Sequence, residues 1–219
     1  MHLKTLTSIF ILISISLAIQ AQETTVIYEK RNRNVQTLFS SDGGFGGHLS
    51  INAKGTEIYN ESALLVGTEL VFTLNHSLNI GVAGYGMPTR VEYQPSTDLS
   101  PRDDLFLELG YGGLFFEPVF FDEKLVHLTL PIIIGGGWAG VSNFDYFDIN
   151  DDYDSVYLSD ESLFFMIEPG VNLEVNLARN VRFTLGGSYR FVNGSDIENV
   201  SDDDLGGLAL GAGIRVGWF

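Results

Sequence analysis

The sequence predicts an all-β fold, an antiparallel up-and-down transmembrane β-barrel of about eight strands. Three observations support this prediction. Apolar and polar residues alternate along most of the chain, short and long polar links follow one another in turn, and the chain ends on the aromatic pair Trp218-Phe219. Alternation with a period of two is typical of a strand with one apolar face. Tight turns at one end and longer loops at the other are typical of barrels that cross a membrane.

The first 21 residues have the features of a secretory signal peptide. Lys4 precedes an apolar run from Leu6 to Ile19, and the small residue Ala21 stands before the expected cleavage point. This apolar run is too short and too weakly flanked for a stable membrane helix. We therefore divide the chain into a signal peptide (1–21), a polar N-terminal arm (22–42) and a barrel (43–219).

The composition excludes several classes of protein. The chain has no cysteine, which excludes disulfides, thiolate metal sites and thiol catalysis. Beyond the signal, no apolar run reaches the roughly 18–20 residues of a membrane helix, so the chain would have to insert into a membrane as strands. Only a closed barrel pairs all the backbone groups of such strands in lipid. The net charge of −16 argues against a nucleic-acid partner, because phosphate binding needs clustered Lys and Arg.

Alternation places eight expected strands in chain order. They are 45–52, 64–74, 78–85, 105–121, 126–138, 162–177, 181–191 and 208–219. A polar link from Lys54 to Glu61 separates the first two strands, and the third loses its alternation near Met87-Pro88, where we expect a bulge because proline cannot donate to a ladder. A soluble sandwich or lipocalin-like barrel would also alternate, but it gives no reason for loops that are short and long in turn.

The links between these strands differ in length and charge. Short links lie at Asn75, Asp122 and Arg179, and long ones follow Lys54, Tyr93, Asn143 and Asn193. Two of the long links, 143–161 and 193–204, hold many of the acidic residues. In the fourth strand we assign the apolar parity to lipid, namely Leu105, Leu107, Leu109, Tyr111 and Phe115.

The opposite parity predicts a charged lumen. Its expected ion-pair network consists of Glu69, Glu108, Glu168, Glu174, Arg182, Arg190 and Arg215. Unpaired buried charges cost several kcal/mol, so these groups should pair. Across the turn at Arg179, Glu174 should lie near Arg182 or Thr184, and Glu168 near Arg190. Because an eight-stranded barrel is just wide enough for side chains to fill, the lumen should be plugged.

Several expected lumen positions are glycine: Gly110, Gly112, Gly135, Gly137, Gly186, Gly211 and Gly213. Glycines inside a strand mark bends or the close approach of another group. The sharp curvature of a small barrel accounts for them. The alternative is that the arm (22–42) enters the mouth of the barrel.

From Gly43 to Phe219 the chain resembles the small outer-membrane β-barrel family of Gram-negative bacteria, the eight-stranded class that includes outer-membrane proteins A and X. The resemblance rests on the strand pattern, the signal peptide and the terminal Trp218-Phe219. It implies a location in the cell outer membrane and folding by the barrel-assembly machinery, which reads a signal that includes the last Phe. Here Phe219 shares the parity of Arg215 rather than that of Trp218, which indicates a one-residue bulge or a weaker assembly signal.

Two candidate sites have alternative interpretations. His48 and Ser50 have a spacing also seen in lipid A deacylase barrels, where a nearby acid completes a Ser-His-acid set. Both point to the lumen here and no acid can be assigned to them, so we predict a structural role and no enzymatic activity. The loop 143–161 concentrates oxygen donors suited to calcium but lacks the glycine and the closing glutamate of an EF-hand, so a solvated acidic loop is expected and calcium binding is the alternative.

The function predicted from the sequence is that of a non-enzymatic outer-membrane barrel with a structural or adhesive role and no cofactor. The alternatives are a narrow channel for ions or small polar solutes and a lipid-modifying enzyme. The expected partners are outer-membrane lipid and lipopolysaccharide, the barrel-assembly machinery and an unidentified extracellular partner. The residues expected to contact that partner are Tyr146, Asp148, Asp152, Tyr153, Asp154 and Tyr157.

Overall fold

The computed structural model describes residues 45–93, 105–122, 124–142 and 158–219, and their strands form one antiparallel sheet. The strands are β1 (Phe45–Ile58), β2 (Glu61–Leu74), β3 (Leu78–Gly86), β4 (Val91–Glu92), β5 (Phe106–Phe120), β6 (Val126–Thr129), β7 (Ile132–Ser142), β8 (Leu158–Ala178), β9 (Val181–Asn193) and β10 (Gly207–Trp218). A four-residue helix, α2 (Asp202–Leu205), precedes β10. The predicted signal peptide and arm lie outside the described residues.

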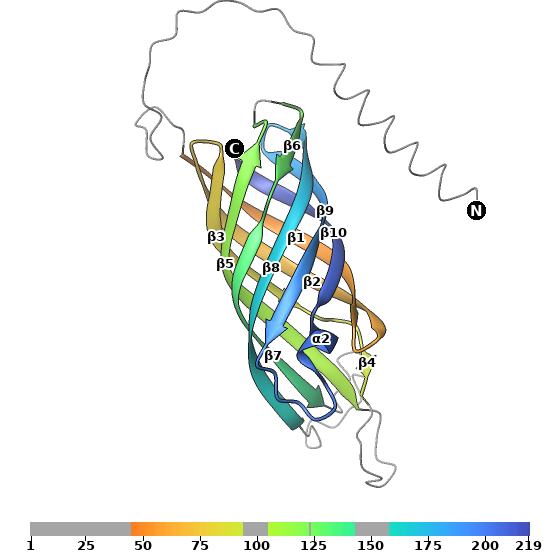
Figure 1. Cartoon of the computed structure of the whole chain (residues 1–219). Helices are drawn as coiled ribbons and strands as arrows, with labels where there is room; N and C mark the ends of the chain where they lie inside the picture. The colour runs from red at the N-terminus through yellow and green to blue at the C-terminus, as the bar shows by residue number, and fades with distance from the viewer. Residues whose placement is uncertain (1–44, 94–104, 123, 143–157) are drawn as a thin grey trace, which may run out of the picture. The chain divides into compact units, whose positions relative to one another are not determined.

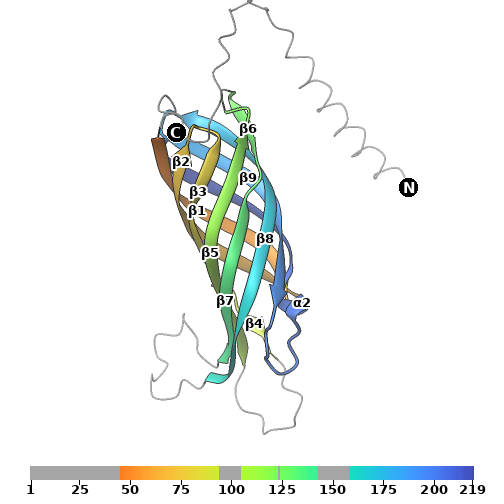
Figure 2. The same ribbon diagram turned by 60° about the vertical axis from the view of Figure 1, so that its left-hand side comes forward.

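These strands close into a ring of eight (Figure 1). β3 and β4 share one position of the ring, because both pair with β5. β6 and β7 share another position, because both pair with β5 on one side and with β8 on the other. β7 lies between β5 and β8, as Figure 2 shows. The first and last strands pair from Gly47 with Trp218 to Thr56 with Ala209, which closes the barrel. The fold predicted from the sequence, an up-and-down antiparallel barrel, is confirmed.

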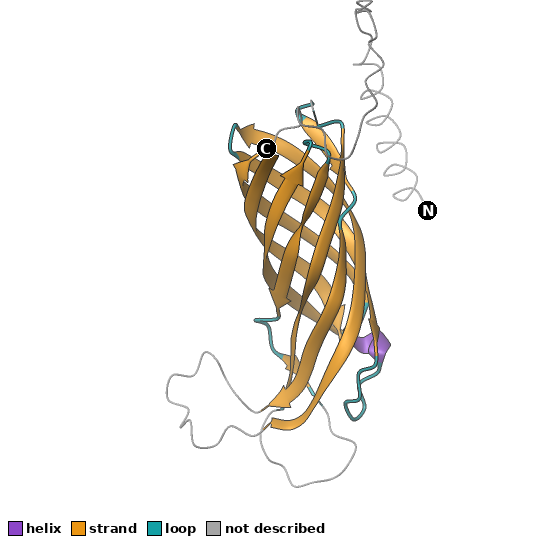
Figure 3. Cartoon of the chain, turned by 90° about the vertical axis from the view of Figure 1, so that its left-hand side faces the viewer, coloured by secondary structure: helices purple, strands orange, loops and turns teal. Residues whose placement is uncertain are grey.

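The two ends of the barrel differ. The C-terminus lies at the same end as the turns after β2, β5 and β8, and we call this the C-terminal end (Figure 1). The link between β2 and β3 is the three residues 75–77, in which Asn75 and His76 have φ values of 51° and 56° and the Ser77 amide donates to the Leu74 carbonyl oxygen at 3.2 Å, as in a tight β-turn. The opposite end carries β4 and α2 (Figure 1), the latter drawn in purple in Figure 3, and we call it the cap end.

The predicted polar link 54–61 is wrong. β1 continues to Ile58, and the turn to β2 consists of Tyr59 and Asn60, with φ values of 49° and 62°. Lys54 sits on the lumen face of β1, where it finds a carboxylate partner, so its charge does not end the strand. The polar residues of this segment belong to a longer strand.

Large apolar side chains are exposed on the outside of the barrel, and every position of the ring contributes some. Examples are Phe72 (68 % exposed), Leu163 (74 %) and Trp218 (76 %). Soluble monomers rarely expose continuous apolar surface of this extent. The outer wall is therefore suited to lipid hydrocarbon. In the described part of the chain, no helix is long and apolar enough to span a bilayer.

β5 is the strand whose predicted parity is wrong. Four of the five residues assigned to lipid are buried in the lumen: Leu107, Leu109, Tyr111 and Phe115. The outward positions instead carry Leu114 and Phe120, both exposed. The lumen is apolar toward the cap end, so an apolar row there marks the inner face. Consequently Glu108, Gly110 and Gly112 lie on the outer face, not in the lumen.

The predicted acidic loop 193–204 is also more ordered than expected. We call residues 194–206 the cap; it contains α2 and an isolated bridge between Ile197 and Val200. Ile197, Val200 and Leu205 are buried and pack onto the apolar residues of the lumen. The cap therefore closes this end of the barrel, although its surface is acidic.

The cap is attached to the barrel by hydrogen bonds. The Tyr93 hydroxyl donates to the carbonyl oxygen of Glu198 at 2.7 Å, and the amide of Glu198 donates to Asp160 at 2.9 Å. Burial raises the pKa of the Tyr93 hydroxyl, with a further contribution from the nearby Glu198 carboxylate. Asp202 accepts from the amides of residues 194 and 195. The middle of the cap is thus attached to the barrel, and its first two residues are bonded to α2.

Candidate functional site

Arg215 of β10 is the centre of a buried charge network in the lumen. Its Nη1 lies 2.7 Å from Oε2 of Glu117 and 2.7 Å from Oε2 of Glu174, and its Nη2 lies 2.9 Å from Oε1 of Glu117. Oε2 of Glu69 is 3.5 Å from Nη2. All four residues are buried. Carboxylates from β2, β5 and β8 therefore converge on one guanidinium, whose planar fork suits bidentate pairing.

Glu174 also binds a second arginine. Nη1 of Arg182 donates to Oε1 of Glu174 at 2.6 Å, and Thr184 lies opposite Glu174 in the β8–β9 register. Nδ1 of His127, which is fully buried, is 3.6 Å from the same oxygen. The structure thus brings Glu174 and Arg182 together across the turn at Arg179.

Neutral donors complete the network. Ser50 Oγ and the Tyr85 hydroxyl each donate to Glu69 at 2.9 Å. The amide of Asn79 donates to Glu117 at 2.8 Å. Buried carboxylates that accept several hydrogen bonds are stabilised in their charged form. The hydrogen bonds of these neutral side chains therefore help to stabilise the buried carboxylates in their charged form.

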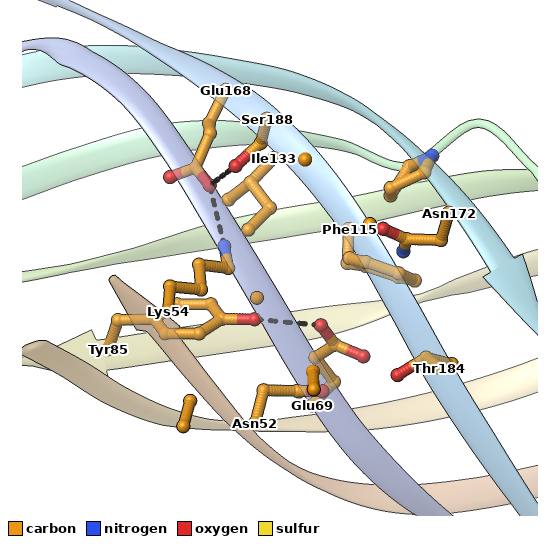
Figure 4. Close-up of a pocket in the computed structure, with 16 residues that line it drawn as sticks. Asn52, Lys54, Glu69, Tyr85, Phe115, Ile133, Glu168, Asn172, Thr184 and Ser188 are labelled. Atoms are coloured by element: carbon orange, nitrogen blue, oxygen red, sulfur yellow. Dashed lines mark hydrogen bonds and ion pairs between the residues drawn. The ribbon is translucent and has the colours of Figure 1, made fainter. Parts of the chain in front are cut away.

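A second ion pair lies nearer the cap end. Lys54 Nζ is 2.5 Å from Oε1 of Glu168, which also accepts from Ser188 at 2.6 Å (Figure 4). The ammonium lies 3.7 Å from the centre of the Tyr85 ring. Arg190 was expected to be the cation that pairs with Glu168. Lys54 pairs with Glu168 instead, so the predicted Glu168–Arg190 pair is wrong.

Arg190 holds the cap instead. Its Nε donates to the carbonyl oxygen of Leu205 at 2.8 Å, and its guanidinium lies 5.2 Å from the centre of the Tyr111 ring. The Tyr111 ring stacks on Tyr85 at 5.4 Å. Arg190 therefore connects the cap to the aromatic residues of the lumen.

Charges balance in the described lumen. Its carboxylates are those of Glu69, Glu117, Glu168 and Glu174, and its permanent cations are Lys54, Arg182, Arg190 and Arg215. Equal numbers of each sign leave the described lumen without net charge, which suits a low-dielectric interior. Lys54 and Glu117 were missed by the sequence analysis, while Glu108 lies outside, where it accepts from Ser142 at 2.5 Å.

Little free space remains between the two ion-pair clusters. A cavity of about 40 Å³ lies there, and its polar lining includes Asn52, Lys54, Glu69 and Glu168 (Figure 4). A water molecule needs roughly 10–15 Å³ on this measure, so the cavity has room for a few waters and for no larger solute. The lumen around it is filled by side chains.

The terminal aromatic pair divides between the two faces. Trp218 points outward, whereas the Phe219 ring lies 5.3 Å from the His48 ring and 3.8 Å from the Arg182 guanidinium. β10 pairs with β1 and β9 without a register shift. The expected one-residue bulge is therefore absent from β10, and Phe219 covers the lumen at the C-terminal end.

The candidate catalytic residues do not form a relay. Ser50 donates to Glu69, and neither ring nitrogen of the buried His48 has a hydrogen-bond partner. No hydrogen bond joins His48 to Ser50, although both are described. Among the described residues, no group of three or more His, Asp or Glu side chains could hold a metal ion. The loop residues expected to contact a partner, 146–157, lie outside the described residues.

Replacing Arg190 with Leu is expected to lower the unfolding temperature of the protein in detergent. The substitution leaves the Leu205 carbonyl without its charged donor, and a hydrogen bond of this kind contributes about 1.5–3 kcal/mol. The matched control is Arg179→Leu in the exposed turn between β8 and β9, which should leave the temperature unchanged. Equal melting of both variants and the parent would show that Arg190 does not hold the cap.

Comparison with known proteins agrees with this architecture. No protein-family model and no curated protein matches the sequence. Among solved structures, Neisserial surface protein A is similar, with 18 % identity over 78 % of this chain and 96 % of that chain and a TM-score of 0.50. The attachment invasion locus protein Ail of Yersinia pestis has 13 % identity over 80 % of this chain and 96 % of that chain, with a TM-score of 0.39. The chain has the fold of the small eight-stranded outer-membrane β-barrel proteins of Gram-negative bacteria.

Proposed function

We propose that the protein is a monomeric, non-enzymatic outer-membrane barrel with a structural or surface-interaction (adhesive) role. The filled lumen is the observation that carries this proposal, because it leaves the barrel rigid and without a wide passage for solutes. The apolar outer wall supports a location in a membrane. A closed barrel of this kind would serve as a membrane anchor for the cap and the loops at its ends.

The proposed orientation places the C-terminal end in the periplasm and the cap end outside the cell. The signal peptide (1–21) would direct export, and the barrel-assembly machinery would read the terminal Trp218 and Phe219. Outer-membrane lipid and lipopolysaccharide would surround the wall. Barrels of this class carry their tight turns on the periplasmic side, which supports the orientation.

The surface role is proposed from the charge of the cap end. Acidic side chains at this end include Glu57, Glu61, Glu92, Asp160, Glu161, Asp196, Glu198, Asp202, Asp203 and Asp204. The predicted contact residues 146–157 would add acids and tyrosines to the same end. Complementary charge steers association, so the extracellular partner would present a basic surface. A non-adherent Gram-negative host that displays the protein should gain attachment to such a surface, and that attachment should weaken at high salt.

The refolded mature protein is expected to leave the current across a planar bilayer at its baseline, because the ion pairs and side chains of the lumen block the path. The faster migration of an unboiled sample than of a boiled one on a gel would establish that the barrel is folded. Discrete conductance steps from such a sample would instead support the channel alternative. The lipid-modifying alternative gains no support from the geometry of Ser50 and His48.

A further inference from the structure

One buried arginine of the lumen lacks an ionic partner. The other three permanent cations, Lys54, Arg182 and Arg215, each form an ion pair with a carboxylate. Arg190 is 0 % exposed and forms no ion pair with any described residue. A buried charge without a counter-ion is costly, so this position favours an anion.

The hydrogen-bonding capacity of Arg190 is only partly filled. Its Nε donates to the carbonyl oxygen of Leu205 at 2.8 Å, and its Nη1 lies 3.5 Å from the Tyr111 hydroxyl. Nη2 has no hydrogen-bond partner among the described residues. Because the N–H groups of Nε and Nη2 point the same way, this edge of an arginine matches the two oxygens of a carboxylate. The cap fills one half of such a site with a single neutral oxygen.

The surroundings of the Leu205 side chain are apolar. Leu205 is fully buried, and it forms one cluster with Ile197 and Val200 of the cap and with apolar residues of the lumen. The lumen residues of this cluster include Leu65, Leu107, Leu109, Val141 and Phe164. The cap thus places a carbonyl oxygen on Arg190 and aliphatic side chains in the apolar lumen. An aliphatic carboxylic acid has the same combination of groups.

The cap is ordered by bonds within itself. Asp202 accepts from the amides of residues 194 and 195, and Ser201 and Asp204 form a capping box at the start of α2. Among the described residues, one backbone–backbone hydrogen bond joins the cap to the barrel, from the Tyr59 amide to the carbonyl oxygen of Asp204. No ladder therefore has to break when the cap leaves the lumen.

A glycine stands at each junction between the cap and the barrel. Gly194 follows β9 and Gly207 begins β10, and their φ values are 92° and 125°. Glycine accepts large changes of backbone conformation because it has no Cβ, and residues at the ends of elements commonly act as hinges. Rotation at these two glycines would lift the cap as a unit.

We propose that the lumen beneath the cap binds an aliphatic carboxylic acid. Its carboxylate would take the Nε and Nη2 edge of Arg190, and its chain would replace the side chains of Ile197, Val200 and Leu205. The cap acts as a lid, and in the closed form the Leu205 carbonyl occupies the position of one carboxylate oxygen. One cation balances one negative charge, which favours a carboxylate over a phosphate monoester. This inference adds a ligand to the proposed surface protein, whose surface role does not depend on it.

Binding is measured with radiolabelled decanoate. The decanoate retained by phosphatidylcholine nanodiscs that hold the refolded mature protein is compared with that retained by empty nanodiscs. We expect a saturable excess of one decanoate per barrel, because the lumen holds one such arginine. Unlabelled decanoate should displace it, whereas decanol, which has the chain without the carboxylate, should not.

Substitution of Arg190 tests the carboxylate contact. Arg190→Lys keeps the charge but lacks the paired N–H groups, so decanoate should bind about tenfold more weakly. The matched control is Arg90→Gln, which removes an exposed arginine at the same end of the barrel and should leave binding unchanged. Faster migration of unboiled than of boiled samples establishes that each variant is folded.

A disulfide tests the lid, since the chain has no cysteine of its own. The Asp196 amide donates to Ser162 Oγ at 2.9 Å, so these positions of the cap and of β8 lie together. Asp196→Cys combined with Ser162→Cys should abolish the saturable binding when oxidised and restore it when reduced.

Each contrary result overturns a stated part of the inference. Folded parent protein that retains no more decanoate than empty nanodiscs would show that the lumen has no such site. Equal affinity of the parent and Arg190→Lys would show that Arg190 does not hold the carboxylate. Binding that persists in the oxidised double-cysteine variant would show that the ligand does not enter beneath the cap.

Discussion

Arg215→Leu is expected to destabilise the barrel more than the loss of any other charged side chain in the lumen. The guanidinium is the shared partner of Glu117 and Glu174, and it lies close to Glu69. Its removal leaves carboxylates buried without a cation, and breaking a buried pair in this way costs about 3–5 kcal/mol. The loss is measured as a lower denaturant midpoint of the protein refolded in detergent, or as a loss of the fast-migrating folded band.

A double variant keeps this prediction testable if the single variant does not fold. Arg215→Leu with Glu117→Leu removes both members of the bidentate pair, and Glu174 still has Arg182. Replacing a buried ion pair with apolar residues is often neutral or stabilising, so folding should recover. Arg182→Leu is the comparison at the partly exposed mouth and should cost less. A midpoint unchanged by Arg215→Leu would contradict the role of this arginine as the centre of the network.

Period-two alternation predicted strands with one apolar and one polar face, and the links that are short and long in turn distinguished a membrane barrel from a soluble sandwich. On β2 the exposed Leu70 and Phe72 alternate with the buried Glu69 and Val71, as the pattern indicates. The β8–β9 hairpin likewise positions Glu174 opposite Thr184 and beside Arg182. In these strands the apolar side faces lipid and the polar side faces the lumen.

β5 could not be assigned in this way, because its lumen face changes from polar to apolar along its length. Toward the cap end Leu107 and Leu109 fill the lumen, and toward the C-terminal end Glu117 joins Arg215. All three share one parity. Glu117 was the available signal, since a glutamate on the row assigned to lipid would be unpaired in hydrocarbon, and this conflict reverses the parity of the strand.

The sequence also could not predict which charged residues far apart in the chain form ion pairs. Lys54 and Glu168 are 114 positions apart and meet only because the barrel closes β1 near β8 and β9. The burial of the cap also depends on long-range contacts, because Leu205 is buried only when the lumen at the cap end presents apolar side chains to it. Local patterns indicate which face a residue occupies, whereas the identity of its partner depends on the register of the whole ring.

Gly135→Leu is expected to prevent or strongly impair folding, although leucine has the higher strand propensity. Gly135 of β7 lies on the inner face opposite Gly113, and a Cβ there would lie 2.5 Å from the Gly113 Cα and closer still to the Gly112 carbonyl oxygen. Overpacking typically costs about 1–3 kcal/mol, and here the cost should reach or exceed that range because the obstructing atoms are backbone.

Gly110→Leu is the control for Gly135→Leu. It tests whether glycine is needed at Gly135 because the neighbouring backbone lies too close for a side chain, or whether the strands need glycine in general. Both glycines belong to neighbouring strands of the wall, but a side chain at Gly110 points outward and meets nothing closer than 3.7 Å. Its denaturant midpoint should equal or exceed that of the parent, because glycine loses more backbone entropy on folding. Gly135→Ala provides a milder version that should still lower the midpoint. Equal midpoints for Gly135→Ala and Gly110→Leu would show that the inner wall can move apart, and the narrow radius of the ring would then not explain the inward glycines.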